Sequence, residues 1–156
     1  MKTKQLLIAL LTAATVFSAC KKDTEEIDTE YPSIDLTGSA FPQQCAIIKK
    51  GEKFIFKARL NDNIELGSVS VDVHHNFDHH SHSTEVNDCN LGAVKQPVNP
   101  FLLIMDFPVP SGLKTYDIAQ EIIVPANIDA GDYHFLIRLT DKTGWQTLKG
   151  ISIKIN

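Results

Sequence analysis

The sequence predicts an all-β domain, a two-sheet sandwich of about seven antiparallel strands. The first observation behind this prediction is that apolar residues recur at every second position in several short runs, the spacing of a half-buried strand. The second is that clusters of Asn, Asp, Gly and Pro separate these runs. The third is that no stretch of about ten residues or more combines helical periodicity with capping residues.

Seven segments carry the strand pattern. In chain order they span residues 33–36, 54–60, 69–73, 101–107, 116–124, 133–139 and 151–155. The alternation is cleanest in the second, third, sixth and seventh segments and less regular in the other three. Turn signals lie between segments at 61–63, 108–112, 129–131 and 141–144. Short strands at this spacing over about 125 residues are typical of two packed antiparallel sheets.

Residues 1–19 predict a secretory signal. Two lysines precede an apolar run over 6–17, which is too short to span a bilayer and is followed by a Ser-Ala pair. Cys20 comes next, and this arrangement resembles the lipobox of bacterial lipoproteins, with Phe17 where leucine is usual. The resemblance implies that Cys20 is lipidated and anchors the chain to a membrane.

Residues 20–30 are polar and charged and predict a flexible tether before a domain over 31–156. Lys21, directly after the cysteine, resembles the pattern of lipoproteins exported to the outer membrane; whether the domain faces the periplasm or the cell surface stays open. Loss of the signal removes Lys2 and Lys4, which leaves 13 basic against 19 acidic residues. This acidic balance argues against nucleic acid as a partner, because phosphate contacts require a basic patch.

Cys45 and Cys89 remain once Cys20 is assigned to the anchor. An exported chain is in an oxidising compartment, which favours a disulfide between them. The alternative is that Cys89 is a metal-binding thiolate. A bridge would close a loop of about 45 residues and stabilise the fold by about 4 kcal/mol in the chain-entropy model.

Two stretches, FKARLNDNIELGSVSVDV and GDYHFLIRLTDKTGW, resemble strands B–C and F–G of bacterial immunoglobulin-like (Ig-like) domains, with Tyr133 at the place of their tyrosine corner. More narrowly, LNDNIELGSVSVDVHHNFDHHSH together with GDYHF resembles an uncharacterised family of Gram-negative outer-membrane lipoproteins with one Ig-like domain and a His-rich loop. The resemblance covers the mature chain and implies a fold and a location. It implies no activity.

Histidine is the compositional anomaly, because five of the six histidines fall within nine residues. These five are His74, His75, His79, His80 and His82. In the segment 69–73 the valines face the core, so Asp72 and His74 face outward, and His134 faces outward from 133–139 by the same alternation. The Ig-like order makes these two strands antiparallel neighbours, so we expect His74 and His134 to meet beside the histidine loop.

Imidazole is the commonest protein ligand of zinc and copper, so this convergence predicts a Zn²⁺ or Cu²⁺ site. The expected ligands are His74 and His134, with two more from among His79, His80 and His82. Asp72 or Asp78 is expected as a further ligand or as the hydrogen-bond acceptor behind one. His75 lies on the opposite strand face and is expected in the core or at a corner.

The sequence thus favours a non-enzymatic, membrane-anchored module that binds a transition metal, buffers it or hands it to an outer-membrane protein partner. The alternative is an Ig-like interaction or adhesion module whose His-rich loop is structural. A minor alternative is a metalloenzyme, because His80-Ser81-His82 resembles the paired ligands of Cu/Zn superoxide dismutases, whose glycine-rich flanks are missing here. The acidic run 61–65 suggests calcium ligands, but its glycine spacing does not match an EF-hand, and a turn is expected there.

Overall fold

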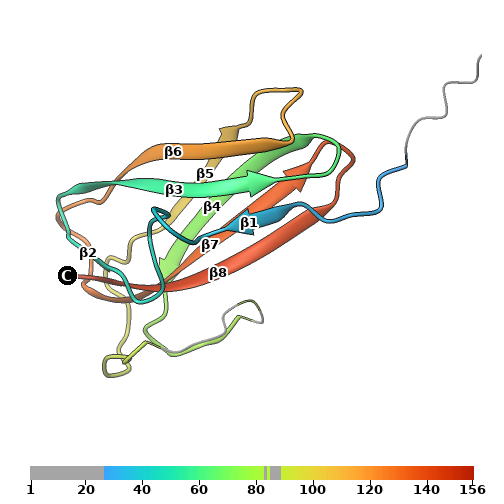
Figure 1. Cartoon of the computed structure of the whole chain (residues 1–156). Coiled ribbons are helices and arrows are strands. Elements are labelled where there is room, and N and C mark those ends of the chain that lie inside the picture. The colour runs from blue at the N-terminus through green and yellow to red at the C-terminus, as the bar shows by residue number, and fades with distance from the viewer. Residues whose placement is uncertain (1–26, 83, 85–88) are drawn as a thin grey trace, which may run out of the picture.

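The structure, a computed structural model, describes residues 27–82, 84 and 89–156 of the chain. Within them the regular structure is entirely β, which confirms the predicted fold class. Eight strands form two packed sheets (Figure 1). No helix among these residues could cross a membrane. The proposed signal and Cys20 lie outside the described residues.

The two sheets differ in size. The smaller sheet has the order β1-β3-β6 and comprises β1 (Ser33–Asp35), β3 (Lys53–Asn61) and β6 (Thr115–Ile123). The larger sheet has the order β2-β8-β7-β4-β5 and comprises β2 (Ile47–Ile48), β4 (Leu66–His75), β5 (Leu103–Pro108), β7 (Gly131–Asp141) and β8 (Gln146–Ile155). All pairings are antiparallel except that of β2 with β8. β2 is additional to the seven predicted strands, because two residues are too few to show a period.

The core lies between the two sheets. The strand faces that point into it are those that carry the alternating apolar residues. Phe56 and Leu60 of β3 meet Phe135 and Ile137 of β7, and all four side chains are fully buried. The rings of Phe56 and Phe135 lie 5.5 Å apart between centroids. Large apolar groups removed from water in this way provide the main driving force of folding.

Strands β4 and β7 are the long central pair of the larger sheet, and they run antiparallel from Leu66 opposite Asp141 to His75 opposite Tyr133. This confirms the expected pairing of the strands that carry His74 and His134. At the Tyr133 end, the Tyr133 hydroxyl donates to the carbonyl of Asp129, four residues earlier in the chain, at 2.6 Å. Different sets of polar side chains therefore lie at the two ends of this strand pair.

Candidate metal centre

His74 and His134 are direct cross-strand partners in the register of β4 and β7. Partners of this kind point to the same face of a sheet, with Cβ atoms about 4.5–5.5 Å apart. Their ring centroids are 5.2 Å apart on the outer face of the larger sheet. Two rigid strands thus position half of the site.

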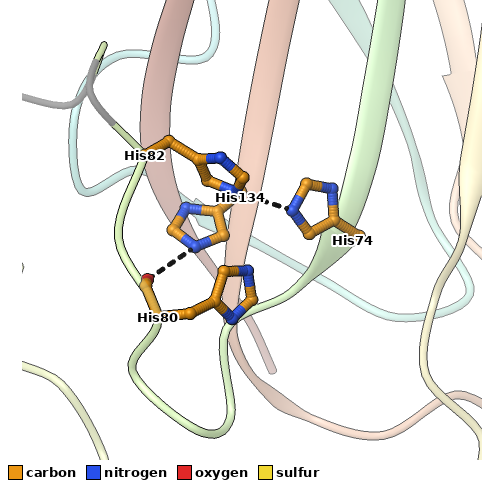
Figure 2. A group of neighbouring side chains, drawn as sticks. All are labelled: His74, His80, His82 and His134. Atoms are coloured by element: carbon orange, nitrogen blue, oxygen red, sulfur yellow. Dashed lines mark hydrogen bonds between the residues drawn. The ribbon is translucent and has the colours of Figure 1, made fainter.

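The other half comes from the loop that follows β4. A turn reverses the chain there, with the His79 amide donating to the Asn76 carbonyl at 3.3 Å. Phe77 anchors this turn, because its buried ring packs edge-on against Tyr133 at a centroid distance of 5.2 Å. The loop then folds back over the sheet and brings His80 and His82 to the strand pair (Figure 2).

Gly131 permits this anchor and was not singled out from the sequence as part of the site. Its φ is +145°, a conformation that residues with a Cβ rarely adopt. A Cβ atom at this position would lie only 2.7 Å from the Phe77 ring. The glycine at the start of β7 therefore provides the space into which the loop's aromatic side chain packs.

One ring nitrogen of each of four histidines can be chosen so that all four lie within 4.8 Å of one another. The four residues are His74, His80, His82 and His134. The Nε2 atoms of His74 and His82 are 3.1 Å apart. Two nitrogens that each lie 2.0–2.1 Å from a tetrahedral ion are about 3.3 Å apart, so this pair is already close to ligand spacing.

The four rings stand at the corners of a nearly regular tetrahedron. Their six centroid separations all fall between 4.6 and 5.6 Å. An imidazole ligated at 2.0–2.1 Å has its centroid about 3.2 Å from the ion, so four such rings in a tetrahedron have centroids about 5.2 Å apart. The cluster can hold a metal ion with little movement of the rings.

Carboxylates orient two of the four rings. Asp72 Oδ1 lies 2.7 Å from His74 Nδ1, and Asp78 Oδ1 lies 2.5 Å from His80 Nδ1. An ionised carboxylate only accepts hydrogen bonds, so each Nδ1 carries the proton and each Nε2 keeps a lone pair for a metal. The hydrogen bond from His80 holds the pKa of the Asp78 carboxyl below its usual value, which keeps this acceptor charged.

His134 is oriented by the loop itself. Its Nε2 lies 3.2 Å from the His80 carbonyl and donates to it. The alternation predicted an outward direction for His134, and the direction is correct. The side chain is nevertheless fully buried, because the loop with His80 and His82 covers that face of β7. His74 and His80 keep 24% and 36% of their side chains exposed, so solvent reaches the cluster from their side.

The two remaining histidines of the sequence cluster lie elsewhere. His79 is exposed at φ +61° and is not one of the four grouped residues. His75 stacks on the Phe77 ring at a centroid distance of 4.9 Å, on the opposite face of β4 from His74. Of the three loop candidates, the structure therefore brings His80 and His82 to the strand pair.

Cys45 and Cys89 form a disulfide. Cys89 is therefore not a thiolate ligand, and the metal-binding atoms that the described residues offer at the cluster are histidine nitrogens. The bridge ties the far end of the histidine loop to the segment before β2, where the Cys45 amide donates to the Ser152 carbonyl at 2.8 Å. Ser152 is the β8 partner of His134 in the sheet register, so the disulfide closes the loop beside the cluster.

A protein-family model described as "Domain of unknown function (DUF4625)" matches residues 18–156. No curated protein sequence matches the chain. Among solved structures, the chain is similar to a superoxide reductase (neelaredoxin) from Ignicoccus hospitalis, with 11% identity, a TM-score of 0.43 and coverage of 82% of each chain.

Two further structures are similar to the chain. The GspB Siglec domain has 18% identity and a TM-score of 0.43 over 83% of this chain and 59% of that one. The sporulation control protein Spo0M from Bacillus subtilis has 9% identity and a TM-score of 0.44 over 83% of this chain and 50% of that one.

Proposed function

The chain belongs to the DUF4625 family, whose description names no function, and from the site itself we propose that the domain binds one Zn²⁺ ion. The observation that carries this proposal is the group of four histidine side chains with ligand nitrogens within 4.8 Å of one another.

The shape of the cluster favours zinc over copper(II). Copper(II) prefers tetragonal sites, in which four ligands lie at the corners of a square. The diagonals of a square exceed its sides by about two fifths. Here the longest centroid separation, 5.6 Å between His74 and His80, exceeds the shortest, 4.6 Å between His82 and His134, by only about a fifth. A near-regular tetrahedral arrangement of the four rings suits the tetrahedral coordination that zinc adopts.

The number of histidine ligands favours a metal-binding role over a catalytic one. Catalytic zinc keeps one coordination position open for water or substrate, whereas four imidazoles fill a tetrahedral shell. We therefore propose a non-enzymatic role, in which the domain buffers the ion or hands it to an envelope partner. The partial exposure of His74 and His80 supports exchange of the ion with solvent or with such a partner.

The domain is proposed to act as an exported lipoprotein anchored through Cys20 to the outer membrane. The sequence pattern before Cys20 supports this location, and a disulfide suits an oxidising compartment. Fractionation of wild-type and Cys20→Ser cells tests it. The wild-type chain should stay with membranes, and the variant should be recovered in the soluble fraction.

Zinc titration of the full chain, first stripped with a chelator, tests the central proposal. The wild-type chain should bind one zinc ion. His80→Ala should weaken binding by about tenfold or more, since one of four ligands is lost. His79→Ala is the matched control: this residue is the sequence neighbour of His80, lies outside the cluster, and its loss should leave the affinity unchanged.

Two results would overturn the proposal: no zinc uptake by the wild-type chain, or equal loss of affinity in both alanine variants. Circular dichroism of each variant ensures that a loss of binding is not a loss of fold. Cobalt(II) in place of zinc reports the geometry, because tetrahedral cobalt absorbs visible light far more strongly than octahedral cobalt. An interaction module with a purely structural loop would show no such metal dependence.

A further inference from the structure

Three aspartates meet at the opposite end of the sandwich from the histidines. One carboxylate oxygen from each of Asp28, Asp62 and Asp141 can be chosen so that the three lie within 4.8 Å of one another. Asp28 lies on the segment before β1, Asp62 on the turn between β3 and β4, and Asp141 at the end of β7. Asp141 is seven residues beyond His134 on β7, which places the two clusters about 23 Å apart along the strand.

In two of the three aspartates, one carboxylate oxygen accepts hydrogen bonds from the backbone amides of a turn. Asp62 Oδ2 accepts from the amides of Ile64 and Glu65 at 2.8 and 2.7 Å. Asp141 Oδ1 accepts from the amides of the turn that follows β7, including Gly144 at 2.6 Å. Both hydrogen-bond sets are the ordinary capping of a turn by an aspartate.

The second carboxylate oxygen of each of these two aspartates accepts no hydrogen bond from its turn. Asp62 Oδ1 and Asp141 Oδ2 are both buried and have no hydrogen-bond partner among the described residues. Asp141 as a whole is only 3% exposed. A buried carboxylate oxygen without a partner loses its hydration and gains nothing in return, so contact with a cation would stabilise it.

Asp28 is the third aspartate of the group and, like Asp141, is a buried residue. It is 7% exposed, although it lies in the segment that the sequence predicted as a flexible tether. Its Oδ1 accepts from the Glu30 amide at 3.0 Å and its Oδ2 from the Thr143 hydroxyl at 3.1 Å. The hydrogen bond from Glu30 leads the causes that hold the pKa of Asp28 below its usual value, so the group stays ionised.

None of the ion pairs between described residues includes any of the three aspartates. Two basic side chains reach these turns, but Lys142 lies 3.9 Å from Glu65 and Lys114 donates to the Asn63 carbonyl at 2.6 Å. Three like charges at this spacing repel one another, and burial strengthens the repulsion. A cation among them would neutralise the charge and satisfy both unpartnered oxygens.

We propose that Asp28, Asp62 and Asp141 bind a Ca²⁺ ion, which clamps the segment leading to β1 onto the end of the sandwich. Oxygens that each lie 2.3–2.6 Å from one calcium ion are at most about 5 Å apart, and the aspartate oxygens meet this limit. Calcium accepts irregular shells of 6–8 oxygens and takes its other ligands from carbonyl groups and water. Magnesium requires a near-ideal octahedron at 2.0–2.1 Å, which three carboxylates on separate segments are poorly arranged to provide.

The site does not depend on the proposed zinc site, because its donors are hard oxygens and its residues lie at the other end of β4 and β7. In Figure 1 the blue segment that leads into β1 lies at one end of the sandwich and the yellow-green loop that follows β4 lies at the other. Calcium would thus act on the part of the domain that faces its N-terminal connection.

Terbium(III) luminescence and calcium-dependent melting of the full chain test the proposal. Terbium mimics calcium and is excited by a nearby tryptophan. Trp145, the only tryptophan, is well placed, since its Nε1 donates to the Asp28 carbonyl at 3.2 Å. We expect terbium emission that calcium displaces, with a calcium Kd of about 0.1–1 mM, and a rise in melting temperature with calcium but not with equal magnesium.

Asp62→Asn and Asp141→Asn separate ion binding from turn formation. An asparagine Oδ1 still accepts the turn amides, while the unpartnered oxygen becomes an amide group that repels a cation. Each variant should weaken calcium binding about tenfold or more and melt no lower than wild type without calcium, because repulsion is relieved. Asp129→Asn is the control: this carboxylate also accepts two backbone amides but lies at the histidine end.

Three outcomes would overturn the proposal. They are no calcium-dependent emission change or melting shift in the wild-type chain, an unchanged calcium affinity in the Asp62→Asn, Asp141→Asn double variant, and an equal effect of magnesium. Melting that falls equally with and without calcium in the variants would assign these aspartates to turn capping alone.

Discussion

The ring nitrogens that point away from the four-histidine cluster control its chemistry at the scale of single residues. His74 donates from Nδ1 to Asp72, His80 donates from Nδ1 to Asp78, and His134 donates from Nε2 to a carbonyl of the loop. The hydrogen bonds of His74 and His80 to the aspartates select the tautomer whose Nε2 carries the lone pair. Both aspartates were identifiable from the sequence, because each lies two positions before the histidine that it orients.

Asp72→Asn should weaken zinc binding by about 10- to 100-fold, the usual effect of removing the partner of a metal-binding histidine. The neutral amide accepts a weaker hydrogen bond from His74 and lowers the basicity of its Nε2. Competition with a chromogenic chelator measures the change.

Asp106→Asn is the matched control for Asp72→Asn. Asp106 is an exposed carboxylate on the adjacent strand β5, opposite Ser70 in the register, with no histidine partner among the described residues. Equal losses of affinity in the two variants would show that general charge, and not the orientation of His74, sets the zinc affinity.

At the scale of elements, the loop after β4 supplies the half of the site that lies outside the sheet. It is held at one end by Phe77, which packs against Tyr133, and at the other by the Cys45–Cys89 disulfide. The strand register positions His74 and His134 without the loop. His80 and His82, in contrast, depend on both anchors, because loop residues have no sheet pairing to fix them.

Replacing both disulfide cysteines with serine should lower the free energy of unfolding by about 4 kcal/mol, since a loop of about 45 residues is released in the unfolded chain. Zinc affinity should fall as well, because ordering His80 and His82 then costs conformational entropy at the moment of binding. Denaturant unfolding with and without zinc measures both effects. Zinc binding unchanged by the double substitution would show that the Phe77 anchor alone orders the loop.

At the scale of the whole molecule, the two candidate sites lie at opposite ends of one strand pair and use ligands that protonate in different pH ranges. Imidazole takes up a proton near pH 6.5, and aspartate near pH 3.9. Asp28 has its pKa lowered in the folded chain, chiefly by the Glu30 amide. It therefore stabilises the fold above the unfolded value, and this contribution is lost as the pH falls through the lower, folded value.

We expect the zinc-dependent rise in melting temperature to vanish as the pH falls from about 7 to 5, because protons displace the metal from the imidazoles. The calcium-dependent rise should persist to lower pH, because free carboxylates protonate at a lower pH than free imidazoles. Melting curves at a series of pH values, each with zinc, with calcium and with neither, test this. Loss of both effects in the same pH range would contradict the separation of the two sites.

Periodicity and turn residues determined the fold class, and periodicity determined the face of each long strand, because side chains alternate strictly along a strand and burial selects one face. It therefore placed His74 and His134 outward, and the Ig-like resemblance made their strands neighbours. Only the tertiary structure showed that the loop selects His80 and His82 over His79 and buries His134 completely. It alone brought Asp28, Asp62 and Asp141 together. Turn geometry and contacts between distant segments determine such groupings, and neither produces a periodic pattern in the sequence.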